Sequence, residues 1–146
     1  MVHPKCANWT FNVDRLSVIF QSMNHSTLAW ADGPALALLA RAKVVHFAST
    51  MPNGAVVLRA LNAVVLDDMV TFHGAPTGDK AACIGRPAVV SAEEVVASIP
   101  SYFIDSQRAC PATTMYRSVQ VEGVVQPVVD PARKARVLEA FMHKYQ

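Results

Sequence analysis

The dipeptide Asn53-Gly54 lies between two long β-rich runs and constrains the fold more than any other part of the sequence. The first run, Val44 to Thr50, and the second, Ala55 to Leu66, are dominated by β-branched and other apolar residues. Asn and Gly readily adopt the positive φ angles that a tight turn between antiparallel strands requires. The pair therefore predicts a β-hairpin, and the chain from Val44 onward reads mainly as β structure.

Further β-rich runs follow at the spacing of short strands. Asp67-Asp68 predicts the next turn, and further strands are expected over residues 69–72, 87–90 and 113–129. Residues 92–96 stay open between helix and strand, because their acidic pair suits a helix start and their valines suit a strand. The sum is a mainly β fold, an antiparallel sheet of about six strands with peripheral helices. Because successive strands are expected to pair as a meander, and no disulfide framework is visible, a small barrel is favoured over a sandwich.

Three other segments predict helices. From Asn12 to Met23, apolar residues recur on one helical face, with the first residue of the segment as the N-cap. A turn at Pro34 leads into a short predicted helix from Ala35 to Ala42. Near the C-terminus, Asp130 caps a proline-initiated helix whose apolar stripe is Val137, Leu138, Phe141 and Met142.

Composition limits the class of protein. The 146 residues suffice for one domain, and 52% hydrophobic against 16% charged residues is apolar for a soluble monomer, which indicates a partner surface. A net charge of +2 without a basic block argues against nucleic acid as a partner. The longest apolar stretch, Pro34 to Val45, contains two cations and is too short to span a membrane. We expect a cytoplasmic protein with reduced cysteines and no secretory signal.

The stretch from Val70 to Lys80 runs from an apolar strand into a loop that contains His73, Gly74 and Gly78. Glycines leave backbone N–H groups accessible, and the lysine supplies a compact positive charge, so the loop suits the phosphate of a ligand. An ordinary hairpin turn with a solvated lysine explains the same pattern. The loop alone leaves both interpretations open.

Three motifs occur in the order found in a known family. They are Pro52 to Asn62, Phe72 to Ala75 with Gly78 to Lys80, and Tyr116 to Gly123. Together they resemble the pyridoxamine 5′-phosphate oxidase-like family, most closely its flavin-binding split-barrel members related to nitroimidazole-resistance proteins. The resemblance divides the chain into an N-terminal helical cover segment, residues 1–43, and an FMN-binding split-barrel domain, residues 44–146.

The resemblance implies a split β-barrel homodimer that binds FMN in the crevice between its subunits. It places Arg59 and Lys80 on the cofactor phosphate, where a guanidinium donates two parallel hydrogen bonds and an ammonium acts as a point charge. It places Asn62 beside the isoalloxazine ring or ribityl chain, and Ser118 on the partner's side of the site. The implied cofactor-binding residues are Arg59, Ala60, Leu61, Asn62, His73, Gly74, Ala75, Lys80 and Ser118.

Each assignment has a structural alternative. An ion pair or an exposed edge position also accounts for Arg59, because an unpaired charge in an apolar strand is costly. Structural roles account equally for Asn62, His73 and Ser118. Asp79 directly precedes the loop lysine, and an acidic side chain beside a phosphate site weakens it unless that side chain is paired or turned away.

The implied function is that of an FMN-dependent oxidoreductase acting on a small molecule, with NADH or NADPH as electron donor. No residue is assigned as a catalytic acid or base, and Cys110 is interpreted as a buried thiol. No metal site is expected, because the histidines lack ligand spacing with cysteines or carboxylates. Two alternatives stay open: a non-catalytic flavin or haem binding or sensor protein, and a structural dimer whose pocket has lost its ligand.

Overall fold

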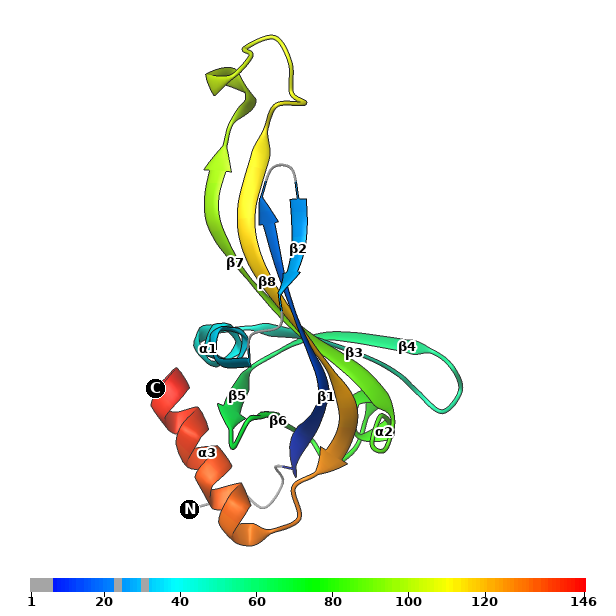
Figure 1. The fold of residues 1–146 in the computed structure, drawn as a ribbon. Coiled ribbons are helices and arrows are strands. Elements are labelled where there is room, and N and C mark those ends of the chain that lie inside the picture. Colours follow the sequence, from blue (N-terminus) through cyan, green and yellow to red (C-terminus); the bar gives the residue numbers. More distant parts are fainter. Residues whose placement is uncertain (1–6, 23–24, 30–31) are drawn as a thin grey trace.

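The computed structural model describes residues 7–22, 25–29 and 32–146, and within these ranges eight strands form one antiparallel sheet (Figure 1). The strands are β1 (Ala7–Ser22), β2 (His25–Ala29), β3 (Val45–Thr50), β4 (Val56–Leu61), β5 (Ala63–Leu66), β6 (Met69–Gly74), β7 (Pro87–Ile99) and β8 (Thr113–Pro127). The helices are α1 (Asp32–Arg41), α2 (Asp79–Ala82), the 3₁₀ helix η1 (Ser101–Phe103) and α3 (Pro131–Tyr145). The predicted mainly antiparallel β fold is confirmed. The sheet has eight strands rather than about six, because β1 and β2 were not predicted as strands and the predicted run from Ala55 to Leu66 forms both β4 and β5.

The sheet closes into a split barrel where β4 meets β5. These two strands stand at opposite ends of the order β4-β3-β7-β8-β1-β6-β5, yet only Asn62 separates them in the sequence. The two edges of the sheet therefore meet at this residue. The predicted meander is wrong, because the chain crosses between the edges at this junction and crosses again between β6 and β7. Strand β1 pairs with both β8 and β6 and so separates the hairpins.

Two turns follow directly from local sequence. The predicted hairpin at Asn53-Gly54 joins β3 to β4, with Gly54 at φ 82° and the Met51 N–H donating to Ala55 O at 2.8 Å. The two-residue turn between β5 and β6 places Asp67 and Asp68 at φ 52° and 57°. A turn with positive φ at both central residues matches the twist of the two strands that it joins, and Asp tolerates positive φ.

The helix predicted from Asn12 to Met23 is wrong, because residues 7–22 form β1; Met23 itself lies outside the described residues. The apolar residues of this segment alternate in two series that are one position out of step, Trp9, Phe11 and Val13, then Leu16, Val18 and Phe20. The register of β1 against β8 shifts between Val13 and Arg15, where a bulge absorbs the extra residue. That slip converts a strand period into apparent helical spacing.

Most of the described residues between 7 and 43 therefore lie in the strands β1 and β2 rather than in helices. Strand β1 lies inside the sheet, and only α1, which begins at Asp32 rather than Ala35, is helical among the described residues of this segment. The boundary that we predict after residue 43 stays a prediction. The open segment 92–96 belongs to β7, which pairs with β8 along most of its length.

The barrel core forms where the inner faces of the strands meet. Phe47 and Phe72 lie at its centre with ring centroids 5.2 Å apart, surrounded by buried valines from β4, β7 and β8. The predicted Asp130 cap of α3 is confirmed, since its carboxylate accepts hydrogen bonds from Ala132 N and Arg133 N. Helix α3 packs against β5 through the buried residues Val64, Val137 and Phe141. The rest of its predicted stripe is less buried, and Met142 is exposed.

Beyond the barrel, β7 and β8 continue as a long two-stranded arm that ends in η1, with the β1–β2 hairpin beside it (Figure 1). Helix α3 lies on the opposite side of the molecule, against the β5 and β6 strands (Figure 1). The face of β7 and β8 and the region around α3 are therefore separate parts of the molecule. Of the predicted site residues, Ser118 lies on the first and Asn62 and His73 lie in the second.

Candidate functional site

Arg59, His73 and Lys80 come together beside the end of β6. Arg59 projects from β4 and pairs with the carboxylate of Asp79, the first residue of α2. Lys80, the next residue of α2, donates from Nζ to the backbone oxygen of His73 at 3.4 Å. The structure therefore brings the predicted strand arginine and the predicted loop lysine into one region, and it pairs the arginine with the carboxylate of Asp79.

The charges in this cluster influence one another. Partial burial, and then the positive charge of Arg59, lower the pKa of Lys80. Partial burial, and then the positive charge of Lys80, lower the pKa of His73, which favours its neutral imidazole. Two cations and a weakly basic histidine thus share one small region. An anion placed there would relieve the repulsion between the cations.

The sequence left Arg59 open between a ligand, an ion-pair and an exposed edge position, and the structure shows an ion pair on the exposed edge strand β4. The side chains of Arg59 and Asp79 are 49% and 47% exposed, so the pair is open to solvent. Arg59 also donates from Nη1 to Leu58 O at 2.9 Å. A half-exposed pair of this kind contributes little stability and exchanges partners readily.

A pocket of about 310 Å³ adjoins the cluster at His73. The imidazole packs edge-on against Phe141 of α3, with ring centroids 4.8 Å apart. Tyr145 lies one turn further along α3 and stacks on Phe141 at 5.8 Å. Asn62 completes the wall from the β4–β5 junction and donates to Lys43 O at 3.3 Å, the backbone-satisfying role that was one of its two interpretations.

Sequence reasoning missed the contribution of α3 to this pocket. Phe141 and Met142 were assigned only to the apolar stripe of a helix, and Tyr145 received no role. All three line the pocket. The signal that the sequence offered was the aromatic pair at i and i+4, which places two rings on one helical face.

The other predicted residues lie around or away from the cluster. Ala60 and Ala75 are exposed, Leu61 packs against the barrel core, and Gly74 is half-buried at the end of β6. Ser118 lies apart, because β3 and β7 separate β8 from the strand that carries Arg59. The structure does not bring Ser118 to the cation cluster within one chain.

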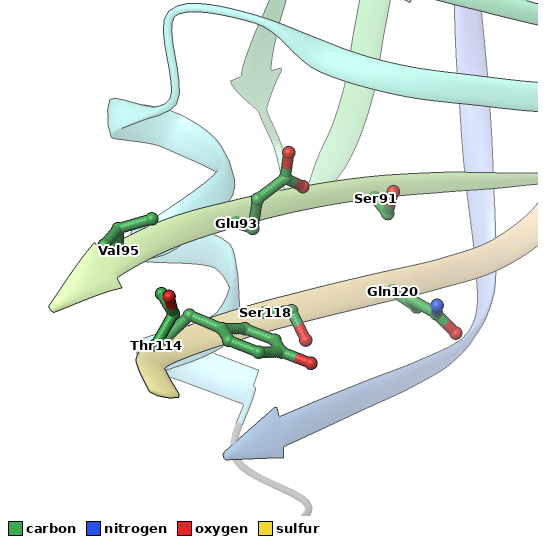
Figure 2. A pocket seen from close by; sticks show the side chains of 7 residues that line it. Ser91, Glu93, Val95, Thr114, Ser118 and Gln120 are labelled. Carbon is green, nitrogen blue, oxygen red and sulfur yellow. The ribbon is translucent and has the colours of Figure 1, made fainter. Parts of the chain in front are cut away.

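Ser118 instead lines a second pocket, of about 370 Å³, on the outer face of β7 and β8. Figure 2 shows side chains of both strands on this face, among them Glu93, Ser118 and Gln120. Glu93 lies 3.5 Å from His46 Nδ1 on β3. The pocket is thus a separate depression on the outer surface of β7 and β8 rather than a continuation of the cation cluster.

The cysteines differ from expectation. Cys110 is exposed, so its interpretation as a buried thiol is wrong: it lies in the turns at the end of the arm. Cys83 is buried, and its thiol donates to Asp79 O at 3.2 Å. In the part of the chain that the structure describes, no three His, Cys, Asp or Glu side chains gather as metal ligands. No helix there is long and apolar enough to cross a membrane.

Comparisons with known proteins agree with the observed fold. No curated protein matches the chain. Among solved structures, the FAD and heme binding protein from Mycobacterium smegmatis is similar to it with a TM-score of 0.64 and 18% identity. At this identity the similarity establishes the fold alone, and it covers 77% of this chain but only 55% of the M. smegmatis chain. The family model described as pyridoxamine 5′-phosphate oxidase matches residues 32–146, which includes α1 as well as the segment after Val44. The chain belongs to the pyridoxamine 5′-phosphate oxidase family.

Proposed function

We propose that this protein binds FMN and acts as a flavin-dependent oxidoreductase on a small molecule. The observation that carries the proposal is the convergence of Arg59 and Lys80 beside the open pocket that His73 borders. Membership of the pyridoxamine 5′-phosphate oxidase family supports the reaction class. The name of the M. smegmatis protein, which shares the fold, supports a flavin as the cofactor.

The residues present fit the phosphate of FMN. Partial burial, and then the positive charge of Arg59, lower the pKa of Lys80, so the two cations lie close enough to repel. A phosphate monoester carries about 1.5 to 2 negative charges at pH 7 and would relieve that repulsion. The guanidinium offers two parallel N–H donors and the ammonium a compact charge, the donor set that phosphate recognition uses. When bound, FMN supplies the electron transfer, and this chain binds and orients it.

The pocket between His73 and α3 suits the planar part of the flavin. Its wall holds the stacked rings of Phe141 and Tyr145, and it offers the polar groups of Asn62, His73 and Gln146 beside these apolar faces. Its volume of about 310 Å³ is at the lower limit for a small-molecule site. We therefore propose that a second subunit completes it.

The outer face of the barrel supports a homodimer. Val56 and Leu58, on the edge strand β4, are 75% and 61% exposed. Beside them a groove of about 490 Å³ is lined mainly by apolar groups of β3, β7 and β8. Contiguous exposed apolar surface of this kind marks a protein interface. In such a dimer, Ser118 of the partner subunit would contact the flavin, which accounts for its distance from Arg59 within one chain.

Non-catalytic binding of flavin or haem is the second candidate. The name of the M. smegmatis protein, which includes both ligands, favours it. The two functions differ in turnover, so anaerobic addition of NADH or NADPH to the FMN-loaded protein separates them. Loss of the visible flavin absorbance supports the oxidoreductase, and an unreduced flavin supports the binding protein. The cytoplasmic location stays a prediction.

A fluorescence titration with FMN tests the site directly. Arg59→Ala and Lys80→Ala should each weaken FMN binding by about 1–3 kcal/mol, because each removes a charge-assisted contact to phosphate. Arg136→Ala is the matched control, since Arg136 is also an exposed arginine paired with an aspartate, Asp67. Unchanged affinity in both site variants would remove the phosphate assignment. Size-exclusion chromatography that returns a monomer would contradict the shared pocket.

A further inference from the structure

Asp79 occupies the position at which an anionic ligand would meet Arg59. Its carboxylate accepts directly from the Arg59 guanidinium, across the gap between α2 and the edge strand β4. The neighbouring Lys80 points instead to the backbone oxygen of His73. The chain therefore carries its own anion on one of the two cations and leaves the other without a carboxylate partner among the contacts of the described residues.

A phosphate and a carboxylate compete for the same donors. Both bind the planar guanidinium through two oxygens, and a bound phosphate within reach of Arg59 would also lie close to the charge of Asp79. Phosphate binding at Arg59 then requires the carboxylate to leave. Both side chains of the pair are about half exposed, so a phosphate can replace the Asp79 carboxylate at Arg59. Breaking the ion pair reduces the binding free energy that the phosphate contact contributes.

We propose that Asp79 is a specificity-determining residue that reduces the preference of this site for phosphorylated over unphosphorylated flavins. The proposal rests on the proposed function, since it concerns the same cation cluster. Asp79 acts through Arg59. Most of the remaining discrimination in favour of phosphate then comes from Lys80. The affinities of the native protein for FMN and riboflavin are then more similar to each other than they would be in a site with two free cations.

The test compares FMN with riboflavin, which lacks the phosphate, in the native protein and in Asp79→Asn. This substitution removes the charge and keeps the size of the side chain. FMN binding should tighten about tenfold, the scale of one charge-assisted contact that the released Arg59 guanidinium gains with the phosphate, and riboflavin binding should stay within about twofold. Asp67→Asn is the control, because it removes an exposed carboxylate from the Arg136 pair and leaves the cluster intact.

A double-variant cycle tests whether Asp79 acts through Arg59. In an Arg59→Ala background, Asp79→Asn should lose most of its effect on FMN, because the guanidinium that it releases is absent. Equal tightening of FMN and riboflavin would indicate a purely structural effect and would overturn the proposal. An unchanged ratio of the two affinities would overturn it as well.

Failure of the proposed function is distinguishable from failure of this inference. If no variant binds either flavin, flavin binding is wrong, and inorganic phosphate then serves as the probe of the cluster alone. Phosphate should raise the thermal midpoint of Asp79→Asn more than that of the native protein. Equal shifts in the two proteins would show that Asp79 does not compete with anions.

Discussion

Tyr145 ties the last turn of α3 to the corner where the barrel closes. Its hydroxyl accepts from Ala63 N at 3.0 Å and lies 3.0 Å from Ala63 O and 3.1 Å from Lys43 O. Ala63 is only 2% exposed, so water has little access to its N–H. One phenolic oxygen thus satisfies a buried donor of β5 and donates to a carbonyl, at the point where β4 and β5 meet.

Replacing Tyr145 with Phe removes these hydrogen bonds and keeps the ring that stacks on Phe141. The carbonyl of Ala63 retains a donor, because Lys144 Nζ lies 2.6 Å from it, so the main loss is the acceptor for the Ala63 N–H. A buried donor left without an acceptor costs about 1–3 kcal/mol. We expect Tyr145→Phe to lower the free energy of unfolding by about 1–2 kcal/mol, or the melting temperature by about 3–6 °C.

Urea unfolding followed by far-ultraviolet circular dichroism measures the effect. The midpoint should fall while the slope with urea stays constant, because the surface exposed on unfolding is unchanged. Tyr102→Phe is the matched control, since Tyr102 is 64% exposed on the arm, and it should change stability by less than about 0.5 kcal/mol. A loss of under about 0.5 kcal/mol for Tyr145→Phe would refute the reasoning, because it would mean that the Ala63 N–H finds another acceptor.

Two further changes probe the same end of the molecule. Asp130→Ala removes the acceptor for two N–H groups at the start of α3 and should cost about 1 kcal/mol in urea unfolding, whereas a neutral result would show that solvent replaces the cap. Burial, and then the charge of Lys43, lower the pKa of Lys144 to about 8, so between pH 8 and 10.5 the unfolded chain binds the proton that the folded chain releases. The unfolding free energy of the native protein should therefore rise with pH across this window relative to Lys144→Met, by about 1 kcal/mol after allowance for solvent screening. Parallel pH profiles of the two proteins would contradict the lowered pKa.

Local signals in the sequence predicted the elements whose cause is local. The Asn53-Gly54 hairpin and the Asp130 cap depend on backbone preferences and hydrogen bonds within a few residues, and both are present. Strand β1 was predicted as a helix because its bulge between Val13 and Arg15 is specified by the pairing with β8, which lies far away in the sequence. Its central place in the sheet is a property of the whole fold, which no window of residues contains.

The site divides in the same way. Arg59, His73 and Lys80 were predicted from motifs on neighbouring strands and loops, and the structure brings them together. Phe141 and Tyr145 reach the pocket only because α3 returns across β5, some eighty positions after Asn62. Their roles depend on where that helix packs. The apolar stripe of α3 predicts that the helix packs against the core, but it does not predict against which strand.

The orientation of Asp79 shows what adjacency in sequence leaves undetermined. An acidic residue beside a lysine either points away from it or shares its surroundings, and the dipeptide alone is compatible with both. The structure places the two side chains on different partners: Asp79 on Arg59, twenty residues earlier, and Lys80 on the backbone of His73. The acid therefore leaves the lysine with its charge and offsets that of the arginine. For this reason the two cations, equivalent in the sequence pattern, should differ in how strongly each recognises a phosphate.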